Sequence, residues 1–288
     1  RRAETAGALV GSGMKVGFIG LGVMGRPMAL HLQTAGHELL VWARRPESAT
    51  GLPAKQCASP AELGRCCDVV FTMITSSADV EAVALGADGL IDGMSAGSVL
   101  IDCSTIAPDA ARRIAARLAE KGIAMLDAPV SGGVQGAIDA SLAIMVGGDA
   151  AVLERVRLLL DCLGKRIVHV GPNGAGQVAK ACNQMIMVAA IQAAAEAMRL
   201  AAAAGVDCGR VKQALSGGSA ASRVLDVMGE RMVQRDFSAG IEARLHHKDF
   251  GLVLEAARQN GTPMPLAAVV GQQLNALMAQ GWGRDDAA

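Results

Sequence analysis

Residues 15–25, Lys-Val-Gly-Phe-Ile-Gly-Leu-Gly-Val-Met-Gly, decide the fold predicted for this chain. The first five are typical of a short buried strand, and a helical period runs from Arg26 to Ala35. Between them lies the pattern G-x-G-x-x-G. Strand, glycine-rich turn and helix in this order are the fingerprint of a dinucleotide-binding βαβ unit. Glycine triplets occur by chance in a chain with 35 glycines, so the strand and the helix carry this assignment. We expect the whole turn to contact a pyrophosphate-containing cofactor through backbone N–H groups: Gly20, Leu21, Gly22, Val23, Met24 and Gly25.

Strands and helices continue to alternate up to about residue 171. Apolar runs predict strands at 38–42, 69–74, 98–102, 123–127, 142–146 and 166–170, and amphipathic patterns predict helices at 107–121 and 150–163. This alternation predicts an α/β Rossmann-type, doubly wound parallel sheet.

The second half of the chain has a different pattern. A long alanine-rich helix is predicted over 175–204, and further helices near 208–216, 222–234, 242–260 and 264–280. We therefore expect a nucleotide-binding domain over 14–173 and an all-helical substrate and oligomerisation domain over 174–288, joined by the long interdomain helix. In such folds the cofactor lies along the carboxyl ends of the strands, and the second domain closes over it. Residues 1–13 are predicted to be a disordered extension.

Composition excludes several other classes of function. The chain has 288 residues, a net charge of +0 and no basic run, so nothing indicates nucleic acid or an anionic membrane surface as a partner. No uninterrupted apolar run reaches the roughly 18 residues of a membrane-spanning helix. The seven cysteines form no C-x-x-C pair, which indicates reduced thiols and a cytoplasmic location. His246 and His247 are adjacent rather than spaced as metal ligands, and no metal site is predicted.

The second strand ends where an adenosine ribose is read in this fold. A carboxylate at that point favours NAD, but this chain has Ala43, Arg44 and Arg45 there. Two guanidinium groups suit a 2′-phosphate, which arginine can hold with paired hydrogen bonds. The alternative is a solvated arginine pair at a helix start. We predict that NADP(H) is preferred and that NAD(H) is possible.

Lys180 lies inside an otherwise apolar helical run. Asn183 and Gln184 follow at i+3 and i+4, so their amides share its helix face. Gly174 and Gly176 precede it and allow a ligand to approach the backbone closely. Burial lowers the pKa of an ammonium group, which makes such a lysine a usable proton donor or acceptor near neutral pH. The alternative is a lysine whose ammonium group extends from a helix end into water.

Three further segments carry chemistry. Asp127-Ala-Pro-Val-Ser-Gly-Gly133 follows a strand, and its serine and paired glycines, Ser131, Gly132 and Gly133, suit an anion-binding nest for a substrate carboxylate. Ser104 and Thr105 end another strand, where a hydroxyl either reaches the cofactor or caps the next helix. His246-His-Lys-Asp249 lies late in the helical half and is equally consistent with a solvated charge pair.

Together these motifs resemble the β-hydroxyacid dehydrogenase family, also called the 3-hydroxyisobutyrate dehydrogenase family. The resemblance runs from about residue 14 to residue 281. It rests on the glycine-rich turn, the 127–133 motif, the Gly174–Gln184 segment and the pair Lys248-Asp249, in family order. Within the family, Leu245–Asp249 and Ala221–Leu225 are most similar to the tartronate semialdehyde reductases.

The resemblance implies a role for each matched residue. It makes Lys180 the catalytic acid and base, gives the carboxylate contact to Ser131 and Gly132, and gives substrate orientation to Asn183. Gly133 and Gln184 are expected to complete the substrate site. Further cofactor contacts are implied at Met73, Ile74, Thr75, Thr105 and Lys248. Two departures stand out, because Thr75 replaces a frequent proline and Ala43 replaces the usual asparagine or aspartate.

The implied reaction is hydride transfer between a nicotinamide and the carbonyl of a small carboxylate-bearing aldehyde, reversible to the hydroxyacid. Alternative substrates are those of 3-hydroxyisobutyrate dehydrogenases and of succinic semialdehyde or glyoxylate reductases. Imine reduction is a second possibility, but relatives of that kind replace the catalytic lysine. A non-catalytic nucleotide-binding module is a third. A homodimer or homotetramer is expected.

Overall fold

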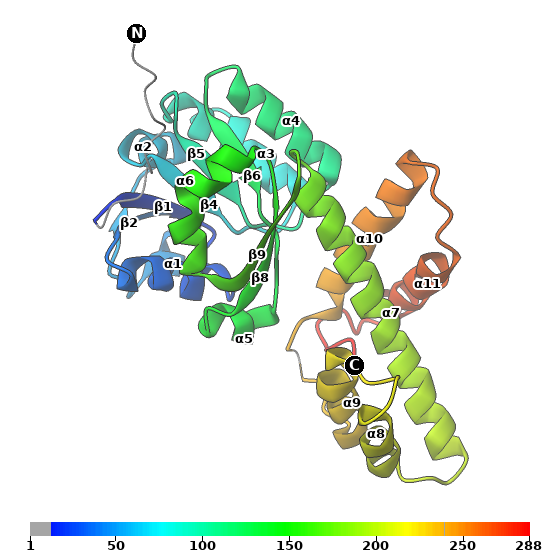
Figure 1. Ribbon diagram of the computed structural model, residues 1–288. Coiled ribbons are helices and arrows are strands. Elements are labelled where there is room, and N and C mark those ends of the chain that lie inside the picture. The colour runs from blue at the N-terminus through cyan, green and yellow to red at the C-terminus, as the bar shows by residue number, and fades with distance from the viewer. Residues whose placement is uncertain (1–12, 239) are drawn as a thin grey trace. The chain divides into compact units, whose positions relative to one another are not determined.

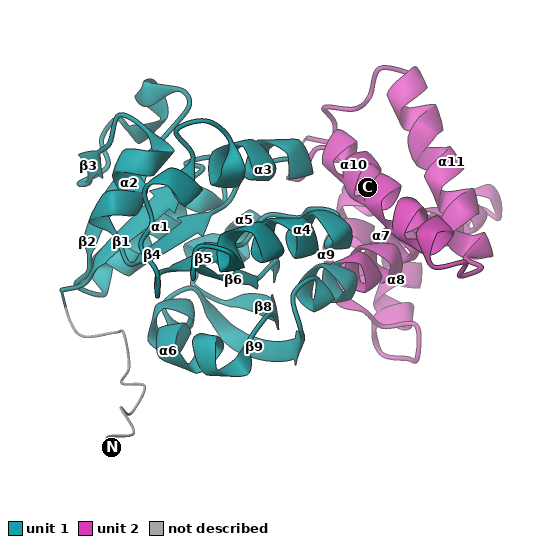
Figure 2. Cartoon of the chain, turned by 90° about the horizontal axis from the view of Figure 1, so that it is seen from above, with its two compact units in different colours: residues 1–180 teal, residues 181–288 magenta. Residues whose placement is uncertain are grey.

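The computed structural model describes residues 13–238 and 240–288. The chain divides into two compact units, unit 1 ending at Lys180 and unit 2 comprising Ala181–Ala288 (Figure 2). The extension predicted over residues 1–13 lies outside the described residues, apart from Gly13.

Unit 1 is built on one sheet with the strand order β3-β2-β1-β4-β5-β6-β8-β7, and β9 pairs with β8 (Figure 1). The strands are β1 (Lys15–Ile19), β2 (Glu38–Trp42), β3 (Lys55–Gln56), β4 (Val69–Thr72), β5 (Val99–Asp102), β6 (Ala124–Asp127), β7 (Val130–Ser131), β8 (Leu142–Gly147) and β9 (Gly164–Gly171). All pairings from β3 to β6 are parallel, whereas β8 runs antiparallel to β6 and β7. The prediction of a mainly parallel, doubly wound sheet is confirmed.

Helices cover both faces of this sheet, so its strands are apolar on both sides. One face packs against α1 (Gly25–Thr34), α5 (Gly133–Ile138) and α6 (Ala150–Asp161). The other face packs against α2 (Pro60–Cys66), α3 (Ser77–Leu85) and α4 (Pro108–Ala119). Two short 3₁₀ turns, Pro46–Ala49 and Leu90–Asp92, connect elements. Because side chains alternate along a strand, Phe71 of β4 enters the first core and Val70 the second.

In its described residues unit 2 is built of helices and the loops between them, with one isolated bridge between Glu242 and Asp286, so the all-helical prediction is confirmed. It contains most of α7 (Ala175–Ala203), followed by α8 (Cys208–Ser216), α9 (Arg223–Gln234), α10 (Ala243–Gln259) and α11 (Pro265–Ala279). Side chains of Asp207 and Ser222 cap the N-termini of α8 and α9. Val188 of α7 and Phe250 of α10 pack with apolar residues of α11 in a small core.

Helix α7 begins in unit 1 and continues into unit 2, so the structural boundary follows Lys180. The boundary predicted near residues 171–174 precedes the helix. The difference arises because the first turns of α7 bond to strand ends of unit 1, as described below. By length and composition alone, α7 passes as a membrane-spanning helix, the one such helix in the described residues. Its apolar side chains are only partly buried: Val188, Ile191 and Met198 are buried, whereas Ile186 and Leu200 are exposed.

Candidate active site and cofactor pocket

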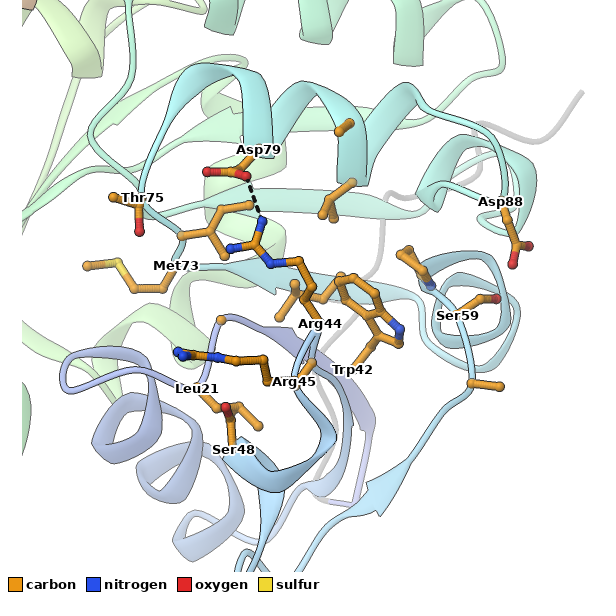
Figure 3. A pocket seen from close by; sticks show the side chains of 18 of the residues that line it. Leu21, Trp42, Arg44, Arg45, Ser48, Ser59, Met73, Thr75, Asp79 and Asp88 are labelled. Carbon is orange, nitrogen blue, oxygen red and sulfur yellow. Dashed lines mark hydrogen bonds and ion pairs between the residues drawn. The ribbon is translucent and has the colours of Figure 1, made fainter.

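A cavity of about 470 Å³ lies at the carboxyl ends of β1, β2 and β4 (Figure 3). Strand β1 lies between β2 and β4 in the sheet, so the chain reverses its direction of winding at this point, where ligands of such folds bind. Predicted cofactor residues from three separate segments line the cavity: Gly20, Leu21, Arg44, Arg45, Met73, Ile74 and Thr75. The walls include Trp42 of β2 and, from the segments around α2 and α3, Ser59, Pro60, Asp79 and Val83.

Two glycines of the turn after β1 are required by the fold itself. Gly20 has φ +101°, and a Cβ built there would lie 2.1 Å from the Met73 carbonyl oxygen. A Cβ on Gly25 would lie 1.8 Å from the Gly20 carbonyl oxygen. Helix α1 starts at Gly25, so its N-terminal amides lie directly after the turn, as a pyrophosphate site requires. Val23 is largely exposed on this turn.

The two arginines after β2 differ in their surroundings. Arg44 Nη1 lies 3.1 Å from Asp79 Oδ1, and this ion pair joins the end of β2 to α3 (Figure 3). In the described part of the chain Arg45 has no ion-pair partner, and its side chain points in another direction (Figure 3). The sequence showed no acid at the end of β2, but the fold brings Asp79 to that position from 35 residues further along.

Buried polar groups hold the segment after β4 in place. The Ile74 N–H donates to Ser104 Oγ at 2.9 Å, and the Ser104 N–H donates to Asp102 Oδ1. The Asp102 carboxyl also accepts the Thr72 hydroxyl at 2.8 Å. Burial raises the pKa of the Asp102 carboxyl to about 6, although these hydrogen bonds act in the opposite direction. Helix α4 is capped at Ala107, whose N–H donates to Ser77 Oγ, so neither Ser104 nor Thr105 is its N-cap residue.

Asp127, the last residue of β6, caps the start of α7. Its Oδ1 accepts the Gly174 N–H at 2.7 Å, and its Oδ2 accepts the Gln177 N–H at 3.1 Å. Burial raises the pKa of the Asp127 carboxyl, and the bonds from the helix amides oppose that shift. A Cβ on Gly176 would lie 2.4 Å from the backbone oxygens of Asp127 and Met145. The expectation that a ligand approaches the backbone here is therefore wrong at Gly176, because β6 and β8 fill the space. A Cβ on Gly174 would lie 3.0 Å from the Pro108 carbonyl oxygen.

Gln177 ties the same helix to the segment that contains Thr105. Its Nε2 donates to the Ser104 carbonyl oxygen at 2.8 Å, and its Oε1 accepts the Ile106 N–H at 3.1 Å. Lys180 follows one turn later on α7 and is only 7% exposed. Its Nζ donates to the Val130 carbonyl oxygen at 2.7 Å. The ammonium group therefore lies beside β7. Its partner Val130 directly precedes the predicted carboxylate-binding residues in the sequence.

Backbone conformation supports the predicted anion-binding nest. Gly132 has φ +142° and Gly133 has φ +66°, both unfavourable for other residues. Helix α5 starts at Gly133, so N–H groups of its first turn follow Ser131 directly. Ser131 itself is fixed by the pairing of β7 with β8, opposite Ala143.

In unit 2 the remaining predicted residues form a chain of polar contacts. Asn183 Nδ2 donates to Gln184 Oε1 at 2.8 Å, and Gln184 Nε2 donates to Asp249 Oδ2 at 2.6 Å. Lys248 Nζ lies 2.9 Å from Asp249 Oδ1. Asp249 and Gln184 thus connect the predicted substrate residue Asn183 to the predicted cofactor residue Lys248. This connection was not evident from the sequence.

Comparisons with known proteins agree with this architecture. Residues 15–171 match the model of the NAD binding domain of 6-phosphogluconate dehydrogenase. Residues 174–288 match the model described as NAD-binding of NADP-dependent 3-hydroxyisobutyrate dehydrogenase. The 2-hydroxy-3-oxopropionate reductase of Escherichia coli is 42% identical over 275 residues, which cover 95% of this chain and 94% of that protein. The chain belongs to the 3-hydroxyisobutyrate dehydrogenase family.

Other members of the family are nearly as similar. An NAD-dependent L-serine dehydrogenase of Pseudomonas aeruginosa is 40% identical over 94% of this chain and 95% of its own length. A solved structure of Mycobacterium tuberculosis 3-hydroxyisobutyrate dehydrogenase with L-serine aligns with a TM-score of 0.88 at 32% identity. That alignment covers 96% of this chain and 97% of the other.

Membership makes this chain an oxidoreductase that acts on hydroxyl groups with a nicotinamide cofactor. The residues of unit 1 fit such a cofactor. The turn after β1 leaves room for close backbone approach at Gly22, where a Cβ would meet nothing within 4 Å, and the cavity has the size of a small-molecule site.

Proposed function

We propose that this enzyme reduces small carboxylate-bearing aldehydes, with 2-hydroxy-3-oxopropionate (tartronate semialdehyde) as its preferred substrate. The observation that carries the proposal is the buried Lys180 ammonium group, bonded to Val130 directly before the Ser131–Gly133 nest. A proton donor beside an anion-binding backbone suits a substrate with a carbonyl near a carboxylate. The choice of substrate rests on the 42% identity to a 2-hydroxy-3-oxopropionate reductase and on the resemblance of residues 221–225 and 245–249.

In this mechanism the residues of the chain bind, orient and move a proton. Ser131 and the amides after Gly132 hold the substrate carboxylate, and Asn183 orients the rest of the molecule. Lys180 donates its proton to the alkoxide oxygen as it develops, and in the oxidative direction the neutral amine accepts the hydroxyl proton. The bound nicotinamide supplies or accepts the hydride. Fixed orientation of the carbonyl provides much of the acceleration.

Two residues that hold the first turns of α7 in place, Asp127 of β6 and Gln177 of α7 itself, support the assignment of Lys180 to this role. Asp127 fixes the start of the helix, and Gln177 joins it to the segment of Thr105. The Val130 carbonyl bond holds the ammonium group in one position, so the proton to be transferred comes from a fixed point.

We further propose a preference for NADP(H) over NAD(H). Arg44 and Arg45 line the cavity at the end of β2, where each guanidinium group can donate hydrogen bonds to a 2′-phosphate. Gly20, Leu21, Met73, Ile74 and Thr75 would hold the remainder of the nucleotide. A cytoplasmic location and a homodimeric or homotetrameric assembly are also proposed. The molar mass measured by light scattering after size exclusion would test the assembly.

A second substrate class is favoured by a specific observation. One relative at 40% identity is an L-serine dehydrogenase, and a structure at 32% identity contains L-serine. L-Serine and 3-hydroxyisobutyrate both carry a hydroxymethyl group one carbon from the carboxylate. The same nest and lysine would serve their oxidation.

Initial rates on a panel of substrates test the proposal. The panel contains tartronate semialdehyde, methylmalonate semialdehyde, succinic semialdehyde and glyoxylate in reduction, and L-serine and 3-hydroxyisobutyrate in oxidation, each with both cofactors. We expect kcat/KM for tartronate semialdehyde to exceed that of every other aldehyde by at least about tenfold. A higher value for another aldehyde, or oxidation of L-serine that outpaces all reductions, would overturn the substrate assignment. Absence of turnover throughout would contradict the reaction class.

A further inference from the structure

The ion pair between Arg44 and Asp79 places a carboxylate at the point of the cavity where the cofactor's 2′-position is read. Asp79 lies in the first turn of α3, and both residues line the cavity. An aspartate at this point of the fold usually comes from the end of β2 and favours NAD. Here the acid comes from a different element and reaches the same arginine that suits a 2′-phosphate (Figure 3).

The local structure fixes Asp79 in this position. Its Oδ2 accepts the Ser76 hydroxyl at 2.6 Å, and its own N–H donates to Ser76 Oγ. Ser76 is the N-cap residue of α3, and its hydroxyl thus bonds both the backbone and the side chain of Asp79. Oδ1 is therefore directed by the helix cap toward Arg44 rather than by the arginine itself. The carboxylate stays at the cavity whether or not Arg44 is bound to it.

The pair is also easy to separate. The Arg44 side chain is 80% exposed and that of Asp79 is 37% exposed. Exposed pairs of this kind alter an equilibrium by only about two- to fivefold, because water solvates both partners. A doubly charged phosphate can therefore take the guanidinium group from Asp79, but the exchange weakens its binding.

We propose that Asp79 determines the ratio of NADP(H) to NAD(H) affinity by competing with the 2′-phosphate for the Arg44 guanidinium group. The inference rests on the proposed contact of Arg44 with that phosphate. NAD(H) leaves the ion pair intact, whereas NADP(H) must break it and must also approach a carboxylate of its own sign. Asp79 thus lowers the preference for NADP(H) that the two arginines would otherwise give.

Asp79→Asn tests the proposal because it removes the charge and keeps an oxygen for the Ser76 hydroxyl. The readout is the dissociation constant, measured by calorimetry on the full chain, for adenosine 2′,5′-bisphosphate and for adenosine 5′-monophosphate. We expect the variant to bind the bisphosphate roughly two- to fivefold more tightly and the monophosphate unchanged. The ratio of NADPH to NADH affinities should rise by the same factor. An unchanged ratio would overturn the proposal.

Asp88→Asn is the matched control. Asp88 lines the same cavity, at the other side of Trp42 from the Asp79 carboxylate (Figure 3), and its left-handed backbone conformation, φ +58°, suits asparagine. It removes an equal charge without touching Arg44, so it should leave the ratio close to wild type. Equal effects of the two variants would show that any negative charge at the cavity weakens phosphate binding. That result would overturn the specific role of the ion pair.

Two further variants separate this inference from the proposed function. Asp79→Glu keeps the charge and the capping position and should restore the wild-type ratio, which guards against a loss caused by a damaged helix start. In Arg44→Ala the effect of Asp79→Asn should vanish, as expected for coupled residues. If Arg44→Ala itself leaves bisphosphate binding unchanged, the proposed phosphate contact fails. If it weakens that binding and Asp79→Asn still has no effect, only the competition fails.

Discussion

Two regions of unit 1 lie at the carboxyl ends of strands of one sheet, yet their polar groups are held in opposite ways. Around the cavity at β1, β2 and β4, the charged side chains are exposed, and Arg44 has one partner through an exposed ion pair. Around the start of α7, Asp127, Gln177 and Lys180 are buried and bonded to backbone groups.

The difference suits the two regions to different tasks. Exposed charges exchange one partner for another at low cost, which suits recognition of a charged ligand that enters and leaves. Buried charges keep their partners, because a lost hydrogen bond leaves a desolvated group unsatisfied. The buried region can therefore fix a proton donor, and the exposed region can select a cofactor.

Lys180→Ala gives the largest expected effect and the sharpest test of this difference. We expect turnover to fall by ~10²–10⁴, because the proton donor is lost, with NADPH affinity nearly unchanged. Lys165→Ala, which removes an exposed lysine from β9, is the control and should retain full activity. A Lys180 variant that keeps most of its turnover, or one that loses NADPH binding, would break the comparison.

Ser131→Ala should act mainly on substrate saturation. A hydrogen bond to a charged carboxylate contributes roughly 1.5–3 kcal/mol, so KM should rise by about ten- to a hundredfold. Ser141→Ala, at an exposed serine before β8, should have no such effect. Poor NADPH binding with normal substrate saturation would assign the nest to the cofactor instead.

Asp127→Ala tests whether the cap of α7 positions the lysine. Removal of both bonds to the helix amides should lower the free energy of unfolding by about 2 kcal/mol. It should also lower kcat about tenfold, since a small misplacement of the proton donor slows transfer. Asp149→Ala removes a comparable carboxylate cap, from the exposed start of α6, where Asp149 Oδ1 accepts the N–H groups of Ala151 and Val152. That control should lose stability in denaturant titrations and keep its kcat. Equal kcat losses in both variants would show a nonspecific effect of instability.

Arg44→Asp tests the exposed region. It should reverse the order of the NADPH and NADH efficiencies, with a change of roughly tenfold, because it replaces an attraction with a repulsion. The new carboxylate would lie near Asp79, which adds to the repulsion of a 2′-phosphate. Arg113→Asp is the control, since Arg113 pairs with Glu81 of α3 and does not line the cavity. Equal efficiencies in wild type, unchanged in the variant, would leave these arginines as a solvated helix start.

Local sequence patterns predicted most of the fold. The strand at 38–42 and the helix at 208–216 have the bounds that were expected. The parallel sheet follows from the alternation of strands and helices up to about residue 171. Helices α2 and α3 were missed although their signals are present. Ser59 Oγ accepts the Glu62 N–H and Ser76 Oγ accepts the Asp79 N–H, and a reading based on apolar periodicity passes over N-cap serines of this kind. Overlooking α3 also concealed Asp79.

Contacts between distant segments set the limit of prediction for the site. The motif that begins at Asp127 was recognised, but its bonds to Gly174 and Gln177 join residues 47 and 50 positions apart. No spacing rule reports a cap that comes from another element. The same holds for Gln177, whose partners Ser104 and Ile106 are more than 70 positions away. The roles assigned to Lys180, Ser131 and Asn183 stay predictions until the variants are measured.

The three glycines of the first turn would tolerate substitution differently in a protein that no longer bound the cofactor. Side chains at positions 20 and 25 would collide with the backbone whether or not a nucleotide is present. At Gly22 a Cβ would meet nothing within 4 Å, so the empty protein tolerates other residues there. In a descendant that kept the fold and abandoned the nucleotide, position 22 would drift first, while 20 and 25 stayed fixed. A side chain at that position would therefore mark descendants that have given up the nucleotide.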